Sequence, residues 1–405
     1  MLPLLASKKE CTGCLSCVQA CMANALKVHL DEDGHYMIRI YENCCVGCHL
    51  CEKKCPVVQN YIYGNNNLGL SLPYAAWAKD DLLRQNSSSG GVFAALAVSV
   101  LKQGGCVAGA EMNDLECRHI PVEKMDDLCR LQGTKYLQSY IGNIYNEVRE
   151  QLKKGRTVLF SGIPCQNAAL LNYLPEQERE RLFCVDVVCS HVPSHKLVDL
   201  LVEHTEYTVN EIVSFRNKRN GWKPLGYTYE LTVSDPLGQR KVVPEKNILL
   251  KGFTAGQTGR YSCYHCRYAY AHRKSDFTIG DLWGDKLFPE QHFNGVSLAI
   301  VHSRKGLELL KKSEVEMHPV DWKDILSFNA RIVCGKKKIM IERRILSLVL
   351  KYFPYSLIKL VYANIYSRKN VFAICYVITR KIRIAIYGKR LKNVIQTILK
   401  TNNNG

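Results

Sequence analysis

The chain has 405 residues, a net charge of +18 and 19 cysteines, and 47% of its residues are hydrophobic. This length is too great for one small core, so we expect two or three domains. No run of about 18 uncharged apolar residues occurs, which argues against a transmembrane helix, and the N-terminal apolar stretch is too short for a signal peptide. We therefore expect a cytoplasmic protein, in which so many cysteines indicate metal or iron–sulfur ligation rather than disulfides.

The positive charge is concentrated at the C-terminus. Residues 336–405 contain 16 Lys and Arg and one acid, Glu342, so this segment carries +15 and the other 335 residues carry +3. Because the body is nearly neutral, the composition does not predict a nucleic-acid-binding protein.

Two runs of four cysteines, "CTGCLSCVQAC" and "CVGCHLCEKKCP", lie within residues 1–60. The spacing of two, two and three residues, given twice, is typical of a ferredoxin with two [4Fe–4S] clusters, where the fourth cysteine of each run binds the other cluster. Zinc held by paired CxxC steps is the alternative, but zinc does not need two complete runs. The predicted ligands are Cys11, Cys14, Cys17 and Cys55 for one cluster, and Cys45, Cys48, Cys51 and Cys21 for the other.

An Asn- and Gly-rich stretch at 61–73 predicts a linker, and segments with the composition of strands and helices begin at residue 74. "YAAWA" and "CVAGAEM" predict strands, and between them "SSSGGVFAALAVSVLKQGG" predicts a Ser/Gly turn and a helix of about three turns. Backbone N–H groups of such a turn can cradle a phosphate, although a plain turn before a buried helix is the alternative. The candidate contacts to a nucleotide or flavin are Ser88, Ser89, Gly90 and Gly91.

Four further cysteines suggest a third cluster. "TVLFSGIPCQ" and "LFCVDVVCS" predict buried strands that end in Cys165 and Cys189, and ligands in open α/β sheets gather at such strand ends. Cys263 and Cys266 add a CxxC step, which completes the four ligands of one [4Fe–4S] cluster. The alternatives are small buried side chains for Cys165 and Cys189, and a zinc half-site or dithiol pair for the CxxC step.

Several motifs then occur in one order: "SSSGGVFAALA", "LQGTKYLQSYIG", "VLFSGIPCQNAALLNYL", "VVCSHVPS", "SFRNKRNGW" and "CYHCRYAYAHRKSDFTIGDLWG". This series resembles the family of coenzyme F420 hydrogenase/dehydrogenase beta subunits, in particular bacterial members with a fused N-terminal two-cluster ferredoxin domain, over residues 1 to about 335. The resemblance implies an α/β (α+β) flavoprotein core at 74–335, and a bound FAD that exchanges electrons with the clusters. It also places Thr134, Lys135 and Tyr136 near the flavin, and Cys165 and the CxxC pair at a core cluster. Cys189 falls in an altered triplet, so its role as the fourth ligand is less secure.

The leading functional prediction is an iron–sulfur flavoprotein oxidoreductase that acts on a small molecule and exchanges electrons with a donor or acceptor protein. The alternatives are a non-catalytic electron-transfer subunit and a true F420-dependent beta subunit. Near the flavin, Lys135, Arg216, Lys218 and Arg273 are candidates to bind an acidic substrate, or else ordinary surface charges.

The segment 336–405 lies outside the resemblance and interleaves apolar with basic residues. This pattern predicts a basic, helical, amphipathic tail with peripheral contact at the inner face of the membrane. A helical cap with a solvated basic face, packed on the core, is the alternative. No nucleic-acid partner is expected.

Overall fold

The computed structural model describes residues 1–204, 208–216, 218, 221–222, 230–243, 248–256, 258–284 and 286–333. By its backbone contacts the chain divides into two compact units, Met1–Ile339 and Met340–Gly405. The tail predicted at 336–405 lies outside the described residues, and the domain boundaries given above remain predictions. Residues 1–60 and the segment after them belong to the same compact unit.

An eight-stranded sheet organises the larger unit, with the strand order β15-β4-β14-β13-β8-β7-β5-β6. The pairs β5–β7, β7–β8 and β8–β13 are parallel, and the other pairs are antiparallel, so the sheet is mixed and the α/β class is confirmed. The strands are β4 Leu72–Ala78, β5 Cys106–Asn113, β6 Glu116–Val122, β7 Val158–Gly162, β8 Leu182–Val187, β13 Phe277–Asp281, β14 Ser297–Val301 and β15 Val315–Pro319.

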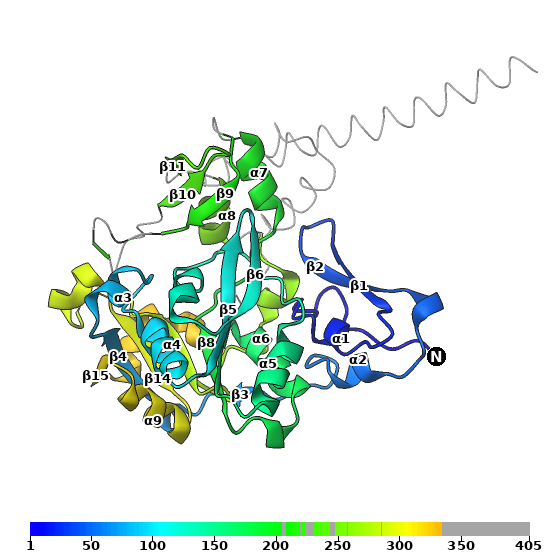
Figure 1. Cartoon of the computed structure of the whole chain (residues 1–405), viewed down its shortest axis with the longest axis horizontal. Coiled ribbons are helices and arrows are strands. Elements are labelled where there is room, and N and C mark those ends of the chain that lie inside the picture. Colours follow the sequence, from blue (N-terminus) through cyan, green and yellow to red (C-terminus); the bar gives the residue numbers. More distant parts are fainter. Residues whose placement is uncertain are drawn as a thin grey trace, which may run out of the picture. The chain divides into compact units, whose positions relative to one another are not determined.

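Helices cover both faces of this sheet, because its central strands are apolar on both sides. In β7, Leu159 packs into the core under α4 (Val92–Lys102) and α9 (Arg304–Lys312), which lie on one face (Figure 1). Phe160, the next residue, points into the core under α5 (Ile144–Lys153) and α6 (Pro164–Tyr173) on the opposite face. The predicted strands at 74–78 and 106–112, and the helix between them, are confirmed as β4, β5 and α4.

The N-terminal segment forms two short helices, α1 (Ser16–Gln19) and α2 (Leu50–Lys53), and a hairpin of β1 (Leu26–Leu30) and β2 (Tyr36–Ile40), with a 3-10 turn at Glu42–Cys44. It packs into the core that α5 and α6 cover. Arg260, which is 2% exposed, anchors it: the guanidinium donates to the carbonyls of Cys11 (3.0 Å) and Tyr36 (2.6 Å). The N-terminal segment is therefore docked through buried hydrogen bonds.

The stretch predicted as a linker is also tied to the core. The two-residue strand β3 (Gly64–Asn65) pairs with β12 (His272–Arg273), and a 3-10 turn follows at Leu68–Leu70. Tyr63 is 1% exposed, and its hydroxyl donates to Asp186 at 2.8 Å. Because Tyr63 is buried, this connection is part of the packed structure.

Smaller elements complete the described chain. A three-stranded sheet is formed by β9 (Glu211–Ser214), β10 (Leu231–Ser234) and β11 (Arg240–Val243), and the other helices are α3 (Asp81–Gln85), α7 (Lys196–His204), α8 (Ile248–Ala255) and α10 (Trp322–Phe328). Further 3-10 turns lie at Met125–Arg130, Glu176–Glu178, Tyr261–His265, Pro289–Asn294 and Ala330–Ile332. Within the ranges that the structure describes, no helix has the length and apolar character needed to span a bilayer.

Candidate cofactor cavity and cysteine clusters

The four cysteines predicted for the first N-terminal cluster surround one small cavity. Cys11, Cys14, Cys17 and Cys55 line a space of about 30 Å³, together with apolar side chains such as Leu15 and Ile38. All four cysteines are buried. Burial raises the pKa of Cys14 to about 12, and the charges of Cys55 and Cys11 add to this rise. Four buried thiolates would repel one another without a cation, so this set of side chains would need a bound metal centre to ionise.

The local backbone explains why the thiols converge. In the first loop, Gly13 and Leu15 have positive φ values of 66° and 57°, and in the second loop Gly47 and His49 have values of 66° and 56°. These pairs occupy equivalent positions, two and four residues after the first cysteine of each run. Left-handed residues at alternate positions coil a short chain tightly, which brings the three cysteines of one loop to the same side.

The second N-terminal set is placed beside the first. Cys17 and Cys51 are buried in one apolar cluster with Cys21 packed against it. Burial raises the pKa of Cys51, and the neighbouring charges of Cys21 and Cys48 raise it further. Cys45 begins the same loop as Cys48 and Cys51, whereas Cys44 is exposed in the preceding 3-10 turn. The structure thus brings Cys55 to the first set and Cys21 close to Cys51, and the ligand roles of all eight cysteines remain a prediction.

The four core cysteines also share one cavity, of about 240 Å³. Cys165 is the second residue of α6, just after β7, and Cys189 lies two residues beyond β8. Because β7 and β8 are parallel neighbours, both cysteines lie at the same edge of the sheet. Cys263 and Cys266 reach it from the 3-10 turn that begins at Tyr261. The structure therefore brings together four cysteines that are separated by up to 101 positions in the sequence.

The chemistry of this site suits an iron–sulfur cluster. Burial raises the pKa of Cys165 and of Cys189, and the charges of the other cysteines in the set add to both rises. Among the described residues, no three His, Cys, Asp or Glu side chains converge closely enough to hold one metal ion. Four thiols around a space of about 240 Å³ leave room for a group of several atoms, and four cysteine thiolates are the usual ligands of a [4Fe–4S] cluster.

A larger cavity of about 290 Å³ lies at the same side of the sheet. It is mostly apolar with a few polar groups, as is usual for cofactor sites. Six of the seven predicted flavin contacts line it: Ser88, Ser89, Gly91, Thr134, Lys135 and Tyr136. Gly90 does not line the cavity. Its N–H donates to the Ser297 hydroxyl at 2.9 Å, so it holds the Ser/Gly loop against β14.

Gly91 begins α4 with a φ of 85°, a left-handed conformation that favours glycine. A Cβ at this position would lie 3.0 Å from the Cα of Arg84. Lys218, partly buried, fixes the same loop from outside, since its ammonium donates to the carbonyls of Arg84, Ser89 (2.7 Å) and Asn294 (2.9 Å). The loop is thus shaped by close packing, and Lys218, one of the candidates to bind an acidic substrate, donates to carbonyls that hold this loop.

Two candidate polar residues face the larger cavity in different states. Loss of hydration lowers the pKa of Lys135 to about 8, and its ammonium donates to the carbonyls of Arg130 and Gln132. Arg216 is paired with Asp281 at 2.8 Å. Tyr136 stacks on Phe253, with ring centroids 4.1 Å apart. Lys135 can therefore exchange its proton close to neutral pH, as can Lys218 beside the loop, whose pKa burial lowers to about 7, whereas Arg216 is held by its own counter-ion.

The three cavities are adjacent. Ile163 lines both the larger cavity and the core cysteine cavity, and Thr12 and Val57 line both the core cysteine cavity and the first N-terminal cavity. Burial raises the pKa of Tyr268, to which the charges of Cys14 and Cys165 also contribute, so this ring lies near both cysteine sets. A continuous series of sites thus runs from the larger cavity to the N-terminal cysteines.

Sequence reasoning missed several residues of the site. Ile163 directly precedes Pro164 and Cys165. Its position at the end of a predicted strand was the feature of the sequence that could have indicated a place in the site. Asp281, in the quoted "GDLWG" motif, ends β13 and binds Arg216 and the indole of Trp222 (3.2 Å). His191 was not missed: the sequence offers it as a proton donor or as a structural residue, and it lines the core cysteine cavity.

The chain is similar to known proteins over part of its length. Residues 155–323 match the family model described as the C terminus of the coenzyme F420 hydrogenase/dehydrogenase beta subunit. One of the subunits of the F420H2 dehydrogenase of Methanosarcina mazei is 25% identical over 328 residues, which cover 75% of this chain and 87% of that protein. A chain of the F420-reducing [NiFe] hydrogenase complex from Methanosarcina barkeri aligns over 64% of this chain and 90% of its own length, with 18% identity and a TM-score of 0.43.

The family model and the Methanosarcina mazei relative identify a redox protein. The chain is similar to the family of coenzyme F420 hydrogenase/dehydrogenase beta subunits, which is the resemblance that its motifs predicted.

Proposed function

We propose that the chain is an F420-linked redox subunit, which binds a flavin-type ring in the larger cavity and exchanges electrons with clusters at the core and N-terminal cysteines. The observation that carries this proposal is Ile163, a single residue that borders both the larger cavity and the core cysteine cavity. Electron transfer needs its centres close together, and one shared side chain keeps these two sites close.

The deazaflavin F420 is the substrate that the family favours. The relative from Methanosarcina mazei is named for F420H2. Use of F420 was the alternative prediction from the sequence, and the comparisons support it better than an oxidoreductase for some other small molecule. The experiment below also tests whether the substrate is a small molecule of another class.

We further propose that FAD is the resident ring. A deazaflavin carries its two electrons together as a hydride, whereas iron–sulfur clusters take them singly; a flavin, when bound, supplies the exchange between these two modes. Its phosphates would lie at the N-terminus of α4, where Ser88, Ser89 and Gly91 line the cavity and the first N–H groups of a helix can bind an anion. The fit rests on the cavity volume, on this loop and on the apolar lining.

The protein's own side chains then have distinct tasks. The apolar walls exclude water from the ring, and Ile163 separates it from the core cysteines. Lys135, with its pKa near 8, can hold or release a proton at the cavity wall. Tyr136, stacked on Phe253, limits the ring's freedom on one side.

The relative is a subunit of a larger enzyme by its name. We therefore propose a protein partner that takes or gives the electrons that reach the N-terminal cysteines. Contact of the tail with a membrane also remains a proposal, and its test is given in the Discussion.

The test uses the full chain, reconstituted anaerobically with iron, sulfide and FAD and then desalted. We expect the protein to retain FAD and to oxidise F420H2 with an artificial one-electron acceptor. A protein that retains no flavin refutes the ring site. Turnover only after a partner protein is added supports the electron-transfer role instead, and turnover with NADH but not F420H2 supports another small-molecule substrate.

A matched pair of variants checks the cavity. Ala110, on β5, lines it, and Ala110→Leu should fill it and lower FAD retention at least tenfold. Asn113→Leu, at the exposed end of the same strand, should retain FAD normally. Equal retention by the two variants would mean that the ring binds elsewhere.

A further inference from the structure

A buried ion pair borders the core cysteine cavity. Arg273, in β12, lines this cavity with a side chain that is 1% exposed, and its guanidinium lies 3.2 Å from the carboxylate of Asp186, which is 0% exposed. The other Lys, Arg and acidic side chains that line the cavity within the described residues are exposed: Lys9, Glu10, Arg267 and Arg331. Arg273 is thus the cation there that water does not screen.

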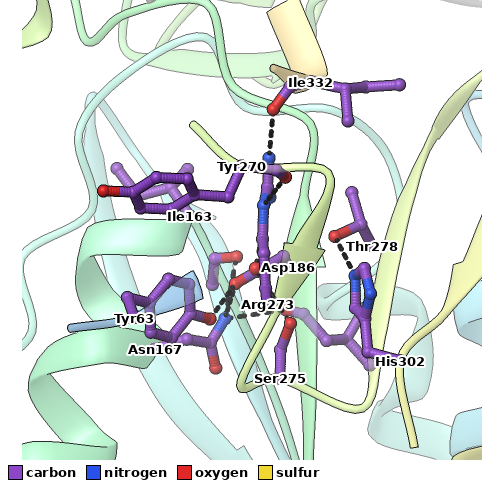
Figure 2. Close-up of polar contacts among 12 residues, drawn as sticks. Tyr63, Ile163, Asn167, Asp186, Tyr270, Arg273, Ser275, Thr278, His302 and Ile332 are labelled. Atoms are coloured by element: carbon purple, nitrogen blue, oxygen red, sulfur yellow. Dashed lines mark hydrogen bonds and ion pairs between the residues drawn. The ribbon is translucent and has the colours of Figure 1, made fainter. Parts of the chain in front are cut away.

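Hydrogen bonds fix the position of this guanidinium. Its Nε donates to the carbonyl of Tyr270 at 2.9 Å, and its Nη2 donates to the carbonyl of Ile332 at 3.0 Å. Figure 2 shows Arg273 held between these carbonyls and the Asp186 carboxylate. With Nε, Nη1 and Nη2 all engaged, the charge cannot move away from the cavity.

The carboxylate of Asp186 is held by neutral donors. It accepts from the Tyr63 hydroxyl (2.8 Å), the Asn167 amide (2.8 Å) and the Ser275 hydroxyl (3.0 Å), as Figure 2 shows. Burial raises the pKa of Asp186, and the Arg273 charge and these donors oppose that rise. The donors stabilise the anion, so Asp186 can orient Arg273 in a place where a lone cation would be costly.

The positive end of the pair is directed at the cysteines. Arg273 lines the cavity together with Cys189 and Cys266, whereas Asp186 is not among the lining residues. At low dielectric a nearby cation favours any state with more negative charge. Net charge close to an iron–sulfur cluster is one of the ways in which a protein sets its potential.

We propose that Arg273, oriented by Asp186, raises the reduction potential of the cluster at the core cysteines by holding a buried positive charge beside Cys189 and Cys266. This inference rests on the proposed function, because it needs a cluster at these cysteines. Arg273 sets the charge beside the cluster and is not a ligand, and the added electron would be supplied by the proposed flavin-type ring or by the clusters proposed at the N-terminal cysteines.

The test is a potentiometric titration of the full reconstituted chain, followed by electron paramagnetic resonance, with iron content measured first. Arg273→Gln should shift the ratio of reduced to oxidised core cluster at least tenfold toward the oxidised form, a fall of about 59 mV for one electron. Asp186→Asn should shift it in the opposite direction, because it leaves the cation unopposed. Arg273→Lys, which keeps the charge, should remain closer to the unaltered protein than Arg273→Gln.

Opposite shifts separate this role from a purely structural one. If the pair only holds the fold together, Arg273→Gln and Asp186→Asn break the same contact and should change the potential in the same direction or not at all, which would overturn the inference. Arg267→Gln is the control, since Arg267 borders the same cavity but is exposed. The reduction potential of the core cluster should not change in this variant. If Arg273→Gln loses the core iron, the reduction potentials of the core cluster in Asp186→Asn and Arg273→Lys still test the inference.

Failure of the proposed function would look different. An unaltered protein with about eight irons rather than about twelve has no core cluster, and the proposed function and this inference fail together. A protein with about twelve irons whose potential is the same in all variants refutes the inference alone.

Discussion

Gly90 offers a sharp test of how the Ser/Gly loop is built. Its φ lies outside the left-handed range, so alanine meets no backbone restriction, and any cost of Gly90→Ala is steric. The new Cβ would lie 2.5 Å from the carbonyl oxygen of Ala76 and 2.7 Å from the nitrogen of Ser297. These atoms belong to β4 and β14, which are paired directly through Ala76 and Ser297 in the interior of the sheet.

Because neither strand can shift, the loop has to move and weaken the bonds that Gly90 makes to Ala78 (2.7 Å) and Ser297 (2.9 Å). Overpacking costs about 1–3 kcal/mol and each of the two weakened hydrogen bonds about 1 kcal/mol, so we expect a loss of roughly 3–5 kcal/mol in the free energy of unfolding.

Urea denaturation, followed by tryptophan fluorescence, measures this loss, and the midpoint of the core transition should fall by roughly 1 M or more. The control is Gly69→Ala, at an exposed position where the Cβ would make an ordinary contact at 3.4 Å. If Gly90→Ala is as stable as Gly69→Ala, the loop does not pack against the sheet as described. If the loop also contacts FAD, Gly90→Ala should weaken FAD retention as well.

The other predictions concern iron, protons and the tail. Cys165→Ala should lower the iron content from about twelve to about eight atoms per chain. Cys106→Ala, at a buried position outside the cysteine cavities, should leave the iron content unchanged. Equal iron contents in the two variants would mean that Cys165 is not a ligand. Lys135 has its pKa lowered from 10.5 to about 8, so the unfolded chain binds more protons between these values, and stability should rise with pH across this window. Lys135→Met should flatten that rise in urea titrations, and an unchanged slope would contradict the assignment. The full chain should cosediment with anionic vesicles, and this binding should weaken as salt increases, since exposed charges are screened within about 8 Å at physiological ionic strength. If a chain truncated after Gly335 binds the vesicles equally well, the tail is not the membrane-binding segment.

The sequence was most informative where chemistry depends on short spacing. The N-terminal runs predicted a grouping of thiols that the structure reproduces around one cavity, because two, two and three intervening residues leave a short loop few ways to close. Cys165 and Cys189 could be placed together because the carboxyl ends of adjacent parallel strands meet at one edge.

Long-range polar contacts could not be predicted in this way. The partners Asp186 and Arg273 are 87 positions apart, and neither lies in a run whose period or spacing points to the other. Tyr63 was assigned to a linker because Asn and Gly surround it, yet its ring is buried and its hydroxyl binds Asp186. Such residues are chosen by tertiary packing, which local composition does not encode.

The anchoring of the N-terminal segment by Arg260 has a kinetic consequence. The guanidinium is buried against the backbone of Cys11 and Tyr36, and it shares this region with Gln138, whose amide donates to the carbonyl of Thr12 at 2.9 Å. A carrier fixed in this way does not diffuse to its reaction partner, so internal electron transfer should be first order, independent of dilution and insensitive to ionic strength. Any dependence of turnover on protein concentration or on salt would then report only on the encounter with an outside partner.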